Sequence, residues 1–454
     1  MISRRRFLQR TLAVAATASL TGAAAATPAF NIRAGRRVLI LGAGLAGLSA
    51  ARLLRQAGYT VTVLEARNRI GGRVFSHEIM PGLVIELGAE WVGASHDRLR
   101  ALCEMLELPL QDNRFETHLL YKGEYSPAGS WHYDPAWKQT LQARLEAFQA
   151  LGTQDLKTLD QTDWWRYLKE TGISERDLDI RELADSTDFG ESIRHVSAFS
   201  ALSEYAYSSP YNEMDYKITG GNSRLPMALA DRVGREHIRL GHKVVAVDQS
   251  GRGVRVSCDN GTQVEADALI CSLPTYAISQ IRWNPALPAD QAAAIRALQY
   301  ARIAKHATVF SRRFWPDEAF DLLTDVYGHY FYHGTKSQPG PAGALVSFTT
   351  GDKADVIGRQ SQAFRRQMVA DTLRPAFGEV GDLITRDMIY YWGNDPLTQG
   401  AYAMYGKGQY LDLQPVLQAR FRRTLFAGEH LADWQGFMEG AVQTGEDAAR
   451  ELMG

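Results

Sequence analysis

A strand, a glycine-rich turn, a helix and a second strand follow one another near the start of the chain, and this order constrains the fold more than any other feature. Residues 38–41 read as a buried strand, an amphipathic helix follows, and residues 60–64 read as the next strand. Between the first strand and the helix, Gly42, Gly44 and Gly47 form the spacing GxGxxG. Such glycines allow a tight turn, a close backbone approach to a pyrophosphate, and close packing of helix on strand. We therefore expect an α/β fold that contains a Rossmann-type dinucleotide-binding domain with a βαβ unit.

Glu65 follows the second expected strand, roughly twenty residues after the glycines, where its carboxylate can accept hydrogen bonds from the ribose hydroxyls of an adenosine. The helix after the glycines points its N-terminus at the phosphates. A glycine turn alone is weak evidence, but the strands, the helix and the acidic residue agree with one another. The residues expected to bind the dinucleotide in this unit are Gly42, Gly44, Leu45, Ala46, Gly47 and Glu65.

The composition describes a globular chain of ordinary charge. The 454 residues are 45% hydrophobic, which is enough for two domains with cores of their own. The formal net charge is -1 and the lysines and arginines are scattered, which argues against nucleic acid as a partner. Cys103, Cys258 and Cys271 lack the spacing of a metal site, so no metal is expected, and a disulfide between Cys258 and Cys271 stays open.

Residues 1–30 read as an export signal. A basic cluster, Arg4, Arg5 and Arg6, precedes a weakly apolar Ala/Thr stretch and small residues that permit cleavage. Residues 3–8, SRRRFL, look like a twin-arginine signal, whose receptor reads the arginine pair. We expect the twin-arginine export machinery to carry the folded protein to the periplasm. The stretch is too short for a stable membrane span, although an uncleaved anchor and a basic helix that begins the fold stay open.

Residues 65–73, EARNRIGGR, continue the dinucleotide site with glycines and arginines. This stretch resembles the flavin-containing amine oxidase superfamily, which includes monoamine, polyamine and L-amino acid oxidases. The resemblance covers residues 36–453 and is weak between about residues 113 and 214. It implies FAD as the cofactor, and a guanidinium beside a pyrophosphate gives charge-assisted bidentate contacts. It places Arg73, with Arg67, near the FAD phosphates, and Ala66 and Gly72 are further expected cofactor-binding residues.

Further patches resemble cofactor-contacting segments of the same family. Residues 86–93, ELGAEWVG, look like the loop that passes the flavin ring, and residues 425–430 and 434–445 look like a strand and helix that complete the cofactor site. The resemblance implies that the N-terminus of this last helix stabilises the anionic reduced flavin. The cofactor-binding residues implied by these patches are Gly88, Ala89, Glu90, Trp91, Gly428, Glu429, Phe437 and Met438. The resemblance also implies cofactor contacts for Val245, in an expected strand at residues 243–247 whose backbone contacts adenine in relatives, and for Trp392.

Lys305 lies in an expected strand within residues 300–315, on the same face as apolar residues. The alternation alone leaves two interpretations open, an edge lysine in solvent and a buried cation. The resemblance favours the second. A family lysine ten residues before the tryptophan of an F-W pair hydrogen-bonds through water to flavin N5, and Lys305 has this spacing from Trp315. The resemblance therefore implies a catalytic role for Lys305, including help in reoxidising the reduced flavin.

The triplet Gly400-Ala401-Tyr402 matches one in which monoamine oxidases carry a cysteine bonded to FAD. Alanine cannot form that thioether, so we expect non-covalent FAD. The resemblance gives Tyr402 and Phe437 the two positions of an aromatic cage that steers the amine nitrogen and excludes water. It implies oxidation of an amine C–N bond to an imine by hydride transfer to flavin N5. The electrons pass to O2, forming H2O2, or to an electron-acceptor protein, and the imine is hydrolysed to an aldehyde or ketone plus ammonia or an amine.

The substrate stays open. The family's L-amino acid oxidases hold the substrate carboxylate with an arginine shortly after the Leu-Gly of the flavin loop, and residues 88–91 contain none, so a small primary or secondary amine is favoured. L-Amino acid oxidase and polyamine oxidase remain alternatives. An FAD-dependent desaturase or porphyrinogen oxidase, and a non-catalytic FAD-binding protein, are alternatives of other classes. A homodimer stays open as well.

The FAD-binding domain is expected to be discontinuous, with residues 34–110, 220–297 and 395–454. Residues 111–219 and 298–394 then form a substrate-binding domain of mixed sheet and helices. Within it, residues 137–185 have helical periodicity. Tyr205, Tyr207 and Tyr211 either line a substrate channel or pack in a core, and packing is the more usual role of such a cluster.

Overall fold

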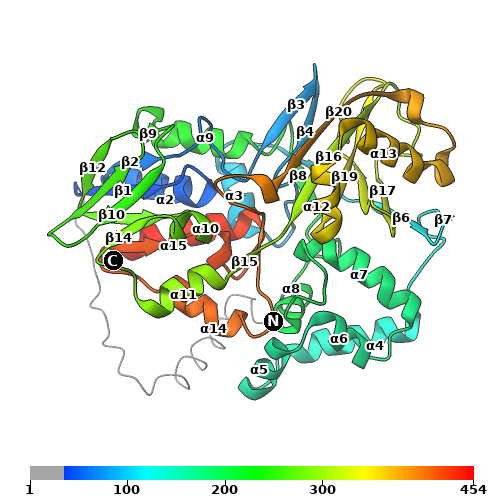
Figure 1. Cartoon of the computed structure of the whole chain (residues 1–454), viewed down its shortest axis with the longest axis horizontal. Coiled ribbons are helices and arrows are strands. Elements are labelled where there is room, and N and C mark those ends of the chain that lie inside the picture. Colours follow the sequence, from blue (N-terminus) through cyan, green and yellow to red (C-terminus); the bar gives the residue numbers. More distant parts are fainter. Residues whose placement is uncertain (1–34) are drawn as a thin grey trace.

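The computed structural model describes residues 35–454 and has the mixed α/β architecture that the sequence predicts (Figure 1). Its first sheet is parallel. The strands in spatial order are β22 (Thr424–Phe426), β13 (Ala268–Cys271), β1 (Arg37–Leu41), β2 (Thr60–Leu64) and β9 (Ile238–Arg239). The runs VLIL in β1 and ALIC in β13 are buried throughout, because both faces of this parallel sheet are covered.

The two faces of the first sheet belong to different cores, because successive strand residues point to opposite sides. Val38 and Ile40 pack in a core with the helices α2 (Leu45–Gln56), α3 (Asp97–Met105), α9 (Arg224–Val233) and α15 (Met438–Met453). Leu39 and Leu41 pack in a second core with another sheet. The strands of this sheet are, in order, β12 (Gln263–Ala266), β11 (Val254–Cys258), β10 (Val244–Asp248) and β14 (Arg282–Asn284). The helices α10 (Thr275–Ser279), α11 (Ala289–Ala297) and α14 (Tyr410–Gln418) contribute residues to the same core.

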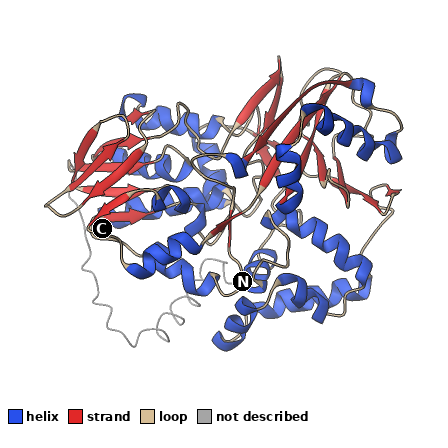
Figure 2. Cartoon of the chain, viewed as in Figure 1, coloured by secondary structure: helices blue, strands red, loops and turns tan. Residues whose placement is uncertain are grey.

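A seven-stranded sheet forms the other large layer of the molecule (Figure 2). Its order is β20 (Ile384–Tyr391), β16 (Ile303–Phe310), β19 (Gly343–Thr350), β18 (Tyr330–His333), β17 (Phe320–Thr324), β6 (Glu116–Tyr121) and β7 (Glu124–Ser126). The helices α12 (Gly351–Arg359) and α13 (Gln362–Phe377) pack beside it. Strand β16 pairs with β19 on one side and β20 on the other, and all of its residues are buried. Lys305 is therefore a buried cation within the sheet, and the interpretation as an exposed edge lysine is wrong.

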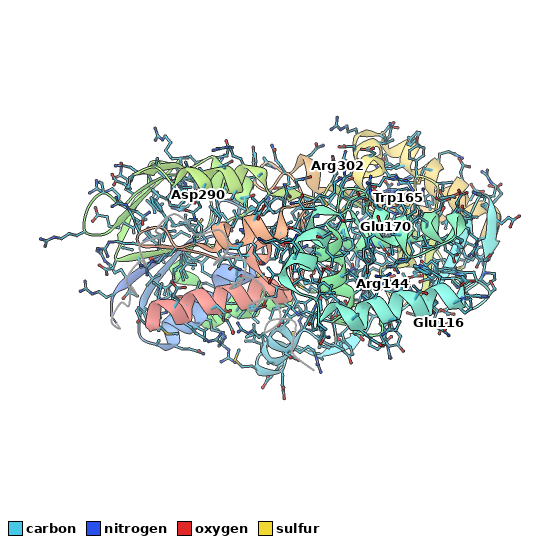
Figure 3. All side chains as sticks on the ribbon, turned by 90° about the horizontal axis from the view of Figure 1, so that it is seen from below. Glu116, Arg144, Trp165, Glu170, Asp290 and Arg302 are labelled. Atoms are coloured by element: carbon cyan, nitrogen blue, oxygen red, sulfur yellow. The ribbon has the colours of Figure 1, made fainter. Side chains whose placement is uncertain are left out.

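The helical part of the chain lies between β7 and β8. It contains α4 (Pro135–Phe148), α5 (Thr153–Gln161), α6 (Trp164–Glu170), α7 (Glu175–Phe189) and α8 (Ala198–Tyr205), which confirms the helical periodicity of residues 137–185. Asp134, Asp163, Ser174 and Ser197 accept hydrogen bonds from backbone N–H groups at the starts of α4, α6, α7 and α8, as N-cap residues do. Figure 3 shows Arg144 and Glu170 of this part on the opposite side of the molecule from Asp290 in α11.

Short elements complete the chain. Three strand pairs are formed by β3 (Ser76–Met80) with β4 (Leu83–Glu86), β5 (Leu110–Asp112) with β8 (Tyr216–Ile218), and β15 (Gln299–Tyr300) with β21 (Ala403–Met404). Single 3-10 turns are η1 (Arg235–His237), η2 (Gly381–Leu383), η3 (Trp392–Asn394) and η4 (Glu429–Leu431).

The domain boundaries stay a prediction, although the sheets draw on the expected segments. The first two sheets use strands from residues 37–64, 238–284 and 424–426, and the seven-stranded sheet uses residues 116–126 and 303–391. The expected export signal, residues 1–30, lies outside the described residues. None of the helices within residues 35–454 is both long and apolar enough to cross a membrane. The three cysteines are free and buried, so the disulfide left open between Cys258 and Cys271 is not formed.

Candidate active site

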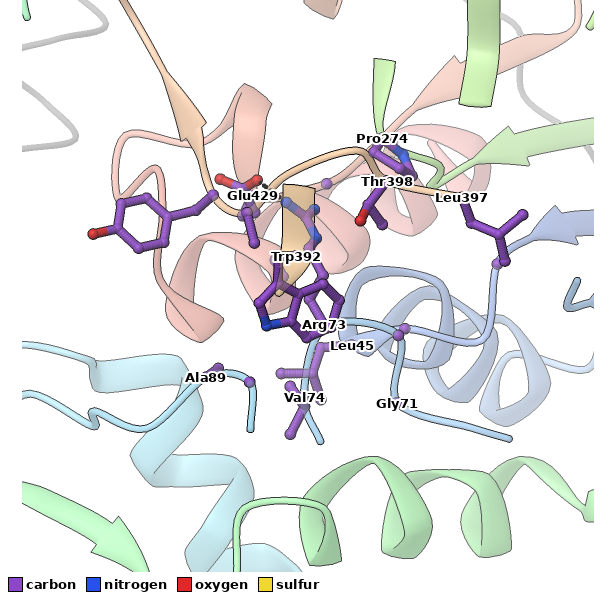
Figure 4. Close-up of a pocket in the computed structure, with 18 of the residues that line it drawn as sticks. Leu45, Gly71, Arg73, Val74, Ala89, Pro274, Trp392, Leu397, Thr398 and Glu429 are labelled. Carbon is purple, nitrogen blue, oxygen red and sulfur yellow. Dashed lines mark hydrogen bonds and ion pairs between the residues drawn. The ribbon is translucent and has the colours of Figure 1, made fainter. Parts of the chain in front are cut away.

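A large cavity lies where the first sheet, the seven-stranded sheet and α7 meet (Figure 4). Its empty volume is about 2320 Å3, which includes space open to solvent. Residues from both expected domains line it, from Leu41 near one end of the chain to Ala441 near the other. The lining therefore joins the glycine turn of the expected dinucleotide site to the expected substrate-binding domain.

The glycine turn has the shape that a phosphate-binding loop needs. Gly42 has φ +99°, a conformation that side chains disfavour. A Cβ on Gly47 would lie 2.1 Å from the carbonyl oxygen of Gly42, so only glycine lets α2 pack this close to the turn. A Cβ on Gly44 would meet nothing within 4 Å, which leaves this backbone open to an approaching group. Gly42 and Gly44 line the cavity, whereas Gly47 is not one of the lining residues.

Glu65 is held rigidly at the edge of the first sheet. One carboxylate oxygen accepts a hydrogen bond from the backbone N–H of Ala43 and the other from that of Arg67, both at 2.8 Å. The side chain lines the cavity. A carboxylate has about four acceptor sites, so this one can accept further hydrogen bonds from a ligand. Together with the glycine turn, this acceptor fits the adenosine and pyrophosphate of FAD.

Two arginines of the EARNRIGGR stretch reach into the same wall, each paired with a carboxylate. Arg67 lies 2.7 Å from Asp395, and Arg73 pairs with Glu429 (Figure 4). Burial is the largest influence on the pKa of Glu429 and raises it, but the charge of Arg73, the influence of His430 and the hydrogen bonds from Gly436 and Arg73 together outweigh it, so this pKa lies below its ordinary value. Glu429 also accepts a hydrogen bond from the backbone N–H of Gly436 at 2.8 Å. The pair therefore joins the EARNRIGGR stretch to the loop before α15.

Lys305 is part of a buried charge cluster in the cavity wall. Its Nζ lies 3.2 Å from Oε2 of Glu90, and the Tyr332 hydroxyl donates a 2.8 Å hydrogen bond to the same oxygen. The Nζ of Lys217 lies 3.7 Å from the other oxygen of Glu90. Burial lowers the pKa of Lys305, while the negative charges of Glu90 and Glu86 act in the opposite direction. Burial, followed by the charge of Glu90, raises the pKa of Glu86 to about 7.

Tyr402 and Phe437 both line the cavity. The Tyr402 hydroxyl donates a 2.6 Å hydrogen bond to the backbone oxygen of Thr187, which fixes the ring. A Cβ on Gly436 would lie 2.9 Å from the Tyr402 ring, so a glycine is needed beside it. Phe437 is the N-cap residue of α15 and packs edge-on against His96, with ring centroids 5.0 Å apart.

The cavity brings together every candidate site residue except Gly47. The lining includes Gly42, Gly44, Leu45, Ala46, Glu65, Ala66, Arg67, Gly72, Arg73, Gly88, Ala89, Glu90, Trp91, Val245, Lys305, Trp392, Tyr402, Gly428, Glu429, Phe437 and Met438. The sequence did not single out the lining residues Thr187, Asp188, Asn212, Met214, Ile303, Tyr330 and Phe348. They lie where the resemblance is weak or within ordinary apolar strands, so no motif marks them. Tyr205, Tyr207 and Tyr211 are not part of the lining.

The profile of one protein family, described as flavin containing amine oxidoreductase, matches residues 45–453. The chain belongs to this family. The match confirms the predicted superfamily, the FAD cofactor and FAD-dependent oxidation of amines. Glu65, the glycine turn and the two arginines are residues of the cavity wall that could hold FAD.

The chain is also similar to individual proteins and, in fold, to solved structures. An L-amino-acid oxidase of Siganus canaliculatus is 28% identical over 93% of this chain and 86% of its own length, and one of Crotalus adamanteus is 25% identical over 92% and 87%. The fold is similar to that of putrescine oxidase, with a TM-score of 0.81 and 23% identity over 93% of this chain and 100% of that one. Cyclohexylamine oxidase from Brevibacterium oxydans has a TM-score of 0.81 and 23% identity over 92% and 99%.

Proposed function

We propose that the enzyme oxidises a small primary or secondary amine rather than an L-amino acid. The observation that carries this proposal is the charge of the cavity wall. Among the described residues, the guanidinium groups that line the cavity are those of Arg67 and Arg73, and each is paired with a carboxylate. Of the two lysines in the lining, Lys305 is likewise paired with Glu90, and Lys243 directly precedes β10, whose Val245 is predicted to contact adenine. A substrate carboxylate would have to compete with these partners, so an amino acid is poorly matched to the site.

The reacting amine is proposed to lie between the rings of Tyr402 and Phe437. Their faces position the nitrogen and exclude water from it. The nitrogen must be neutral, because its lone pair forms the C=N bond as the adjacent C–H bond breaks and the hydride leaves. When bound, FAD accepts this hydride and passes the electrons to O2, giving H2O2, or to another acceptor. Lys305 holds a water and places positive charge at this end of the cavity.

The cofactor is proposed to be bound without a covalent link, since Ala401 lines the cavity beside Tyr402 and carries no thiol.

The test of substrate class is product identification with purified enzyme. Simple amines should give an aldehyde or ketone in equal amount with ammonia or amine, whereas L-amino acids should give no 2-oxo acid. Faster turnover of an L-amino acid than of every simple amine would contradict the proposal.

The protein is also proposed to reach the periplasm by twin-arginine export, supported by the SRRRFL stretch at residues 3–8. This route carries folded proteins, so FAD can be loaded before export. Cell fractionation tests it. The yellow enzyme should appear in the periplasm, and replacing Arg4 and Arg5 together by lysine should leave it in the cytoplasm. An unchanged distribution would contradict this export route.

A further inference from the structure

His96 packs against Phe437, one of the two rings between which the reacting amine is proposed to lie. The ring centroids are 5.0 Å apart and the rings meet edge-on, at 62°. Trp434 completes a triangle of edge-on contacts, 5.5 Å from His96 and 5.8 Å from Phe437. Phe437 is half-buried and lines the cavity, whereas His96 is fully buried and is not part of the lining. His96 therefore supports the Phe437 ring from the protein interior.

Both nitrogens of the His96 ring face a partner. Nδ1 accepts a 2.9 Å hydrogen bond from the backbone N–H of Gly93. Because Nδ1 is the acceptor, the proton of the neutral ring lies on Nε2. Nε2 in turn lies 3.4 Å from Oε2 of Glu213, whose side chain is fully buried as well. The ring cannot turn without losing one of these two contacts, so its face toward Phe437 is fixed.

Glu213 is held as firmly as the ring that it faces. The Ser95 hydroxyl donates a 2.7 Å hydrogen bond to Oε2, and the backbone N–H of Ser209 donates a 2.6 Å hydrogen bond to Oε1. A Cβ on Gly93 would overlap the Glu213 carboxylate, so glycine is required at that position. Glu213 therefore joins the chain that follows the flavin-loop stretch to residues 209–213.

The segment that carries Glu213 also forms part of the cavity wall, because its neighbours Asn212 and Met214 are lining residues. Asn212 and Glu213 have φ values of 48° and 62°. Residues other than glycine adopt this left-handed conformation rarely, and it persists only where surrounding contacts hold it. The contacts of Glu213 supply that support. The buried pair of Glu213 and His96 thus connects two separate parts of the lining, residues 212–214 and Phe437.

We propose that His96 and Glu213 are positioning residues that hold the Phe437 ring in place and thereby determine which amines fit beside it. This inference rests on the proposed placement of the reacting amine between Tyr402 and Phe437. A ring that loses its support can move into the space behind it, which loosens the hold on a small amine and makes room for a larger one. A displacement of about 1 Å can cost about a hundredfold in rate, and one methylene in a pocket is worth about tenfold or more in selectivity.

The experiment compares the best straight-chain primary amine with its isomer branched at the carbon that carries the nitrogen. The readout is the ratio of their kcat/KM values, which does not depend on the fraction of enzyme that is folded or loaded with FAD. His96→Ala should shift this ratio about tenfold toward the branched amine, with a lower kcat for the straight-chain amine. His96→Asn keeps an acceptor for the Gly93 N–H but has no ring, and should give the same shift with a smaller loss of thermal stability. Glu213→Gln keeps the shape of the side chain and should give a smaller shift in the same direction.

Binding without turnover gives a second readout. The Kd of the branched amine for photoreduced holoenzyme, which cannot oxidise it, should fall about tenfold in His96→Ala. His132→Ala changes an exposed histidine outside the lining and should alter neither the Kd nor the ratio.

Phe437→Ala separates this inference from the proposal on which it rests, and should shift the ratio at least as far as His96→Ala. If Phe437→Ala shifts the ratio but His96→Ala and His96→Asn keep the wild-type value, the inference is overturned while the amine placement stands. If Phe437→Ala itself keeps the wild-type ratio, the amine placement fails and the inference fails with it. Failure to oxidise any simple amine would overturn the proposed function as well.

Discussion

Lys305 and Glu90 form a buried ion pair, with 3.2 Å between Nζ and Oε2, in the wall of the cavity that Tyr402 and Phe437 also line. The two residues come from segments far apart in the sequence, the flavin-loop stretch and the middle of the seven-stranded sheet. Their pairing keeps a cation in an apolar wall, because an unpaired charge there would be costly. The pair is therefore the first place to test the chemistry.

Lys305→Met should leave FAD bound and slow the reaction of the reduced enzyme with O2 about a hundredfold or more, because positive charge near the reacting oxygen is lost. Stopped-flow reoxidation of photoreduced enzyme measures this rate. Lys407→Met, at a half-exposed lysine outside the cavity, is the control. If the lysine-to-methionine change at residue 305 leaves both reduction and reoxidation unchanged, its assigned role is wrong.

Glu90→Gln should shift the pH dependence of the same step to lower pH. Burial lowers the pKa of Lys305 and the charge of Glu90 acts against this, so removing that charge lowers the pKa further. The charged form is then lost at lower pH, and the fast reaction with it. Tyr332→Phe, which removes a hydrogen bond to Glu90 but no charge, should keep the wild-type profile. A profile that stays in place, or moves to higher pH, in Glu90→Gln would speak against this coupling.

The pH dependence of kcat/KM should follow the titration of the substrate. Only the neutral amine is expected to react, and simple amines titrate near a pKa of about 10. The value should rise with pH and level off above the pKa of the amine. Two substrates with different amine pKa values serve as each other's control, since the rise should move with the substrate. A flat profile below the pKa would rule this requirement out.

FAD should be released when the enzyme is precipitated with acid, because Ala401 offers no thiol for a covalent link. The flavin absorbance of the supernatant and the pellet measures this partition. Ala401→Cys places a thiol at the same position of the cavity wall and should raise the fraction retained on the protein. Retention of the yellow colour in the wild-type pellet would refute non-covalent binding.

Gly47→Ala should lower the free energy of unfolding by about 3 kcal/mol or more, the upper end of the usual cost of overpacking. The reason is that the new Cβ would lie 2.1 Å from the backbone oxygen of Gly42. FAD content should fall with it, since the glycine turn moves. Thermal unfolding and the flavin-to-protein absorbance ratio measure both effects. Gly251→Ala, where a Cβ meets nothing within 4 Å, should change neither. Normal stability in Gly47→Ala would contradict the packing argument.

Much of the cofactor-binding part of the site could be predicted from the sequence, because the residues that form it are close together in the chain. A glycine turn such as Gly42–Gly47 needs particular residues at fixed spacing, and Glu65 follows it in the same βαβ unit. The seven-stranded sheet shows the limit of such reasoning. Alternation around Lys305 could not tell a central strand from an edge strand, because both neighbours of β16 are distant in sequence.

The residues missed by the sequence are held by tertiary contacts. Lys217 and Tyr332 reach Glu90 from separate strands, and Asp188 meets the cavity at the end of a helix whose sequence reads as ordinary and polar. No spacing rule connects these positions. The cavity lining alone shows that they share a site.

The most direct test of FAD-dependent amine oxidation is the visible absorption of the bound flavin during anaerobic mixing with an amine, followed by admission of air. The account predicts that a simple amine bleaches the flavin band within the turnover time, that an L-amino acid does not, and that the colour returns with O2 or an added acceptor. A flavin band that no amine bleaches would contradict it.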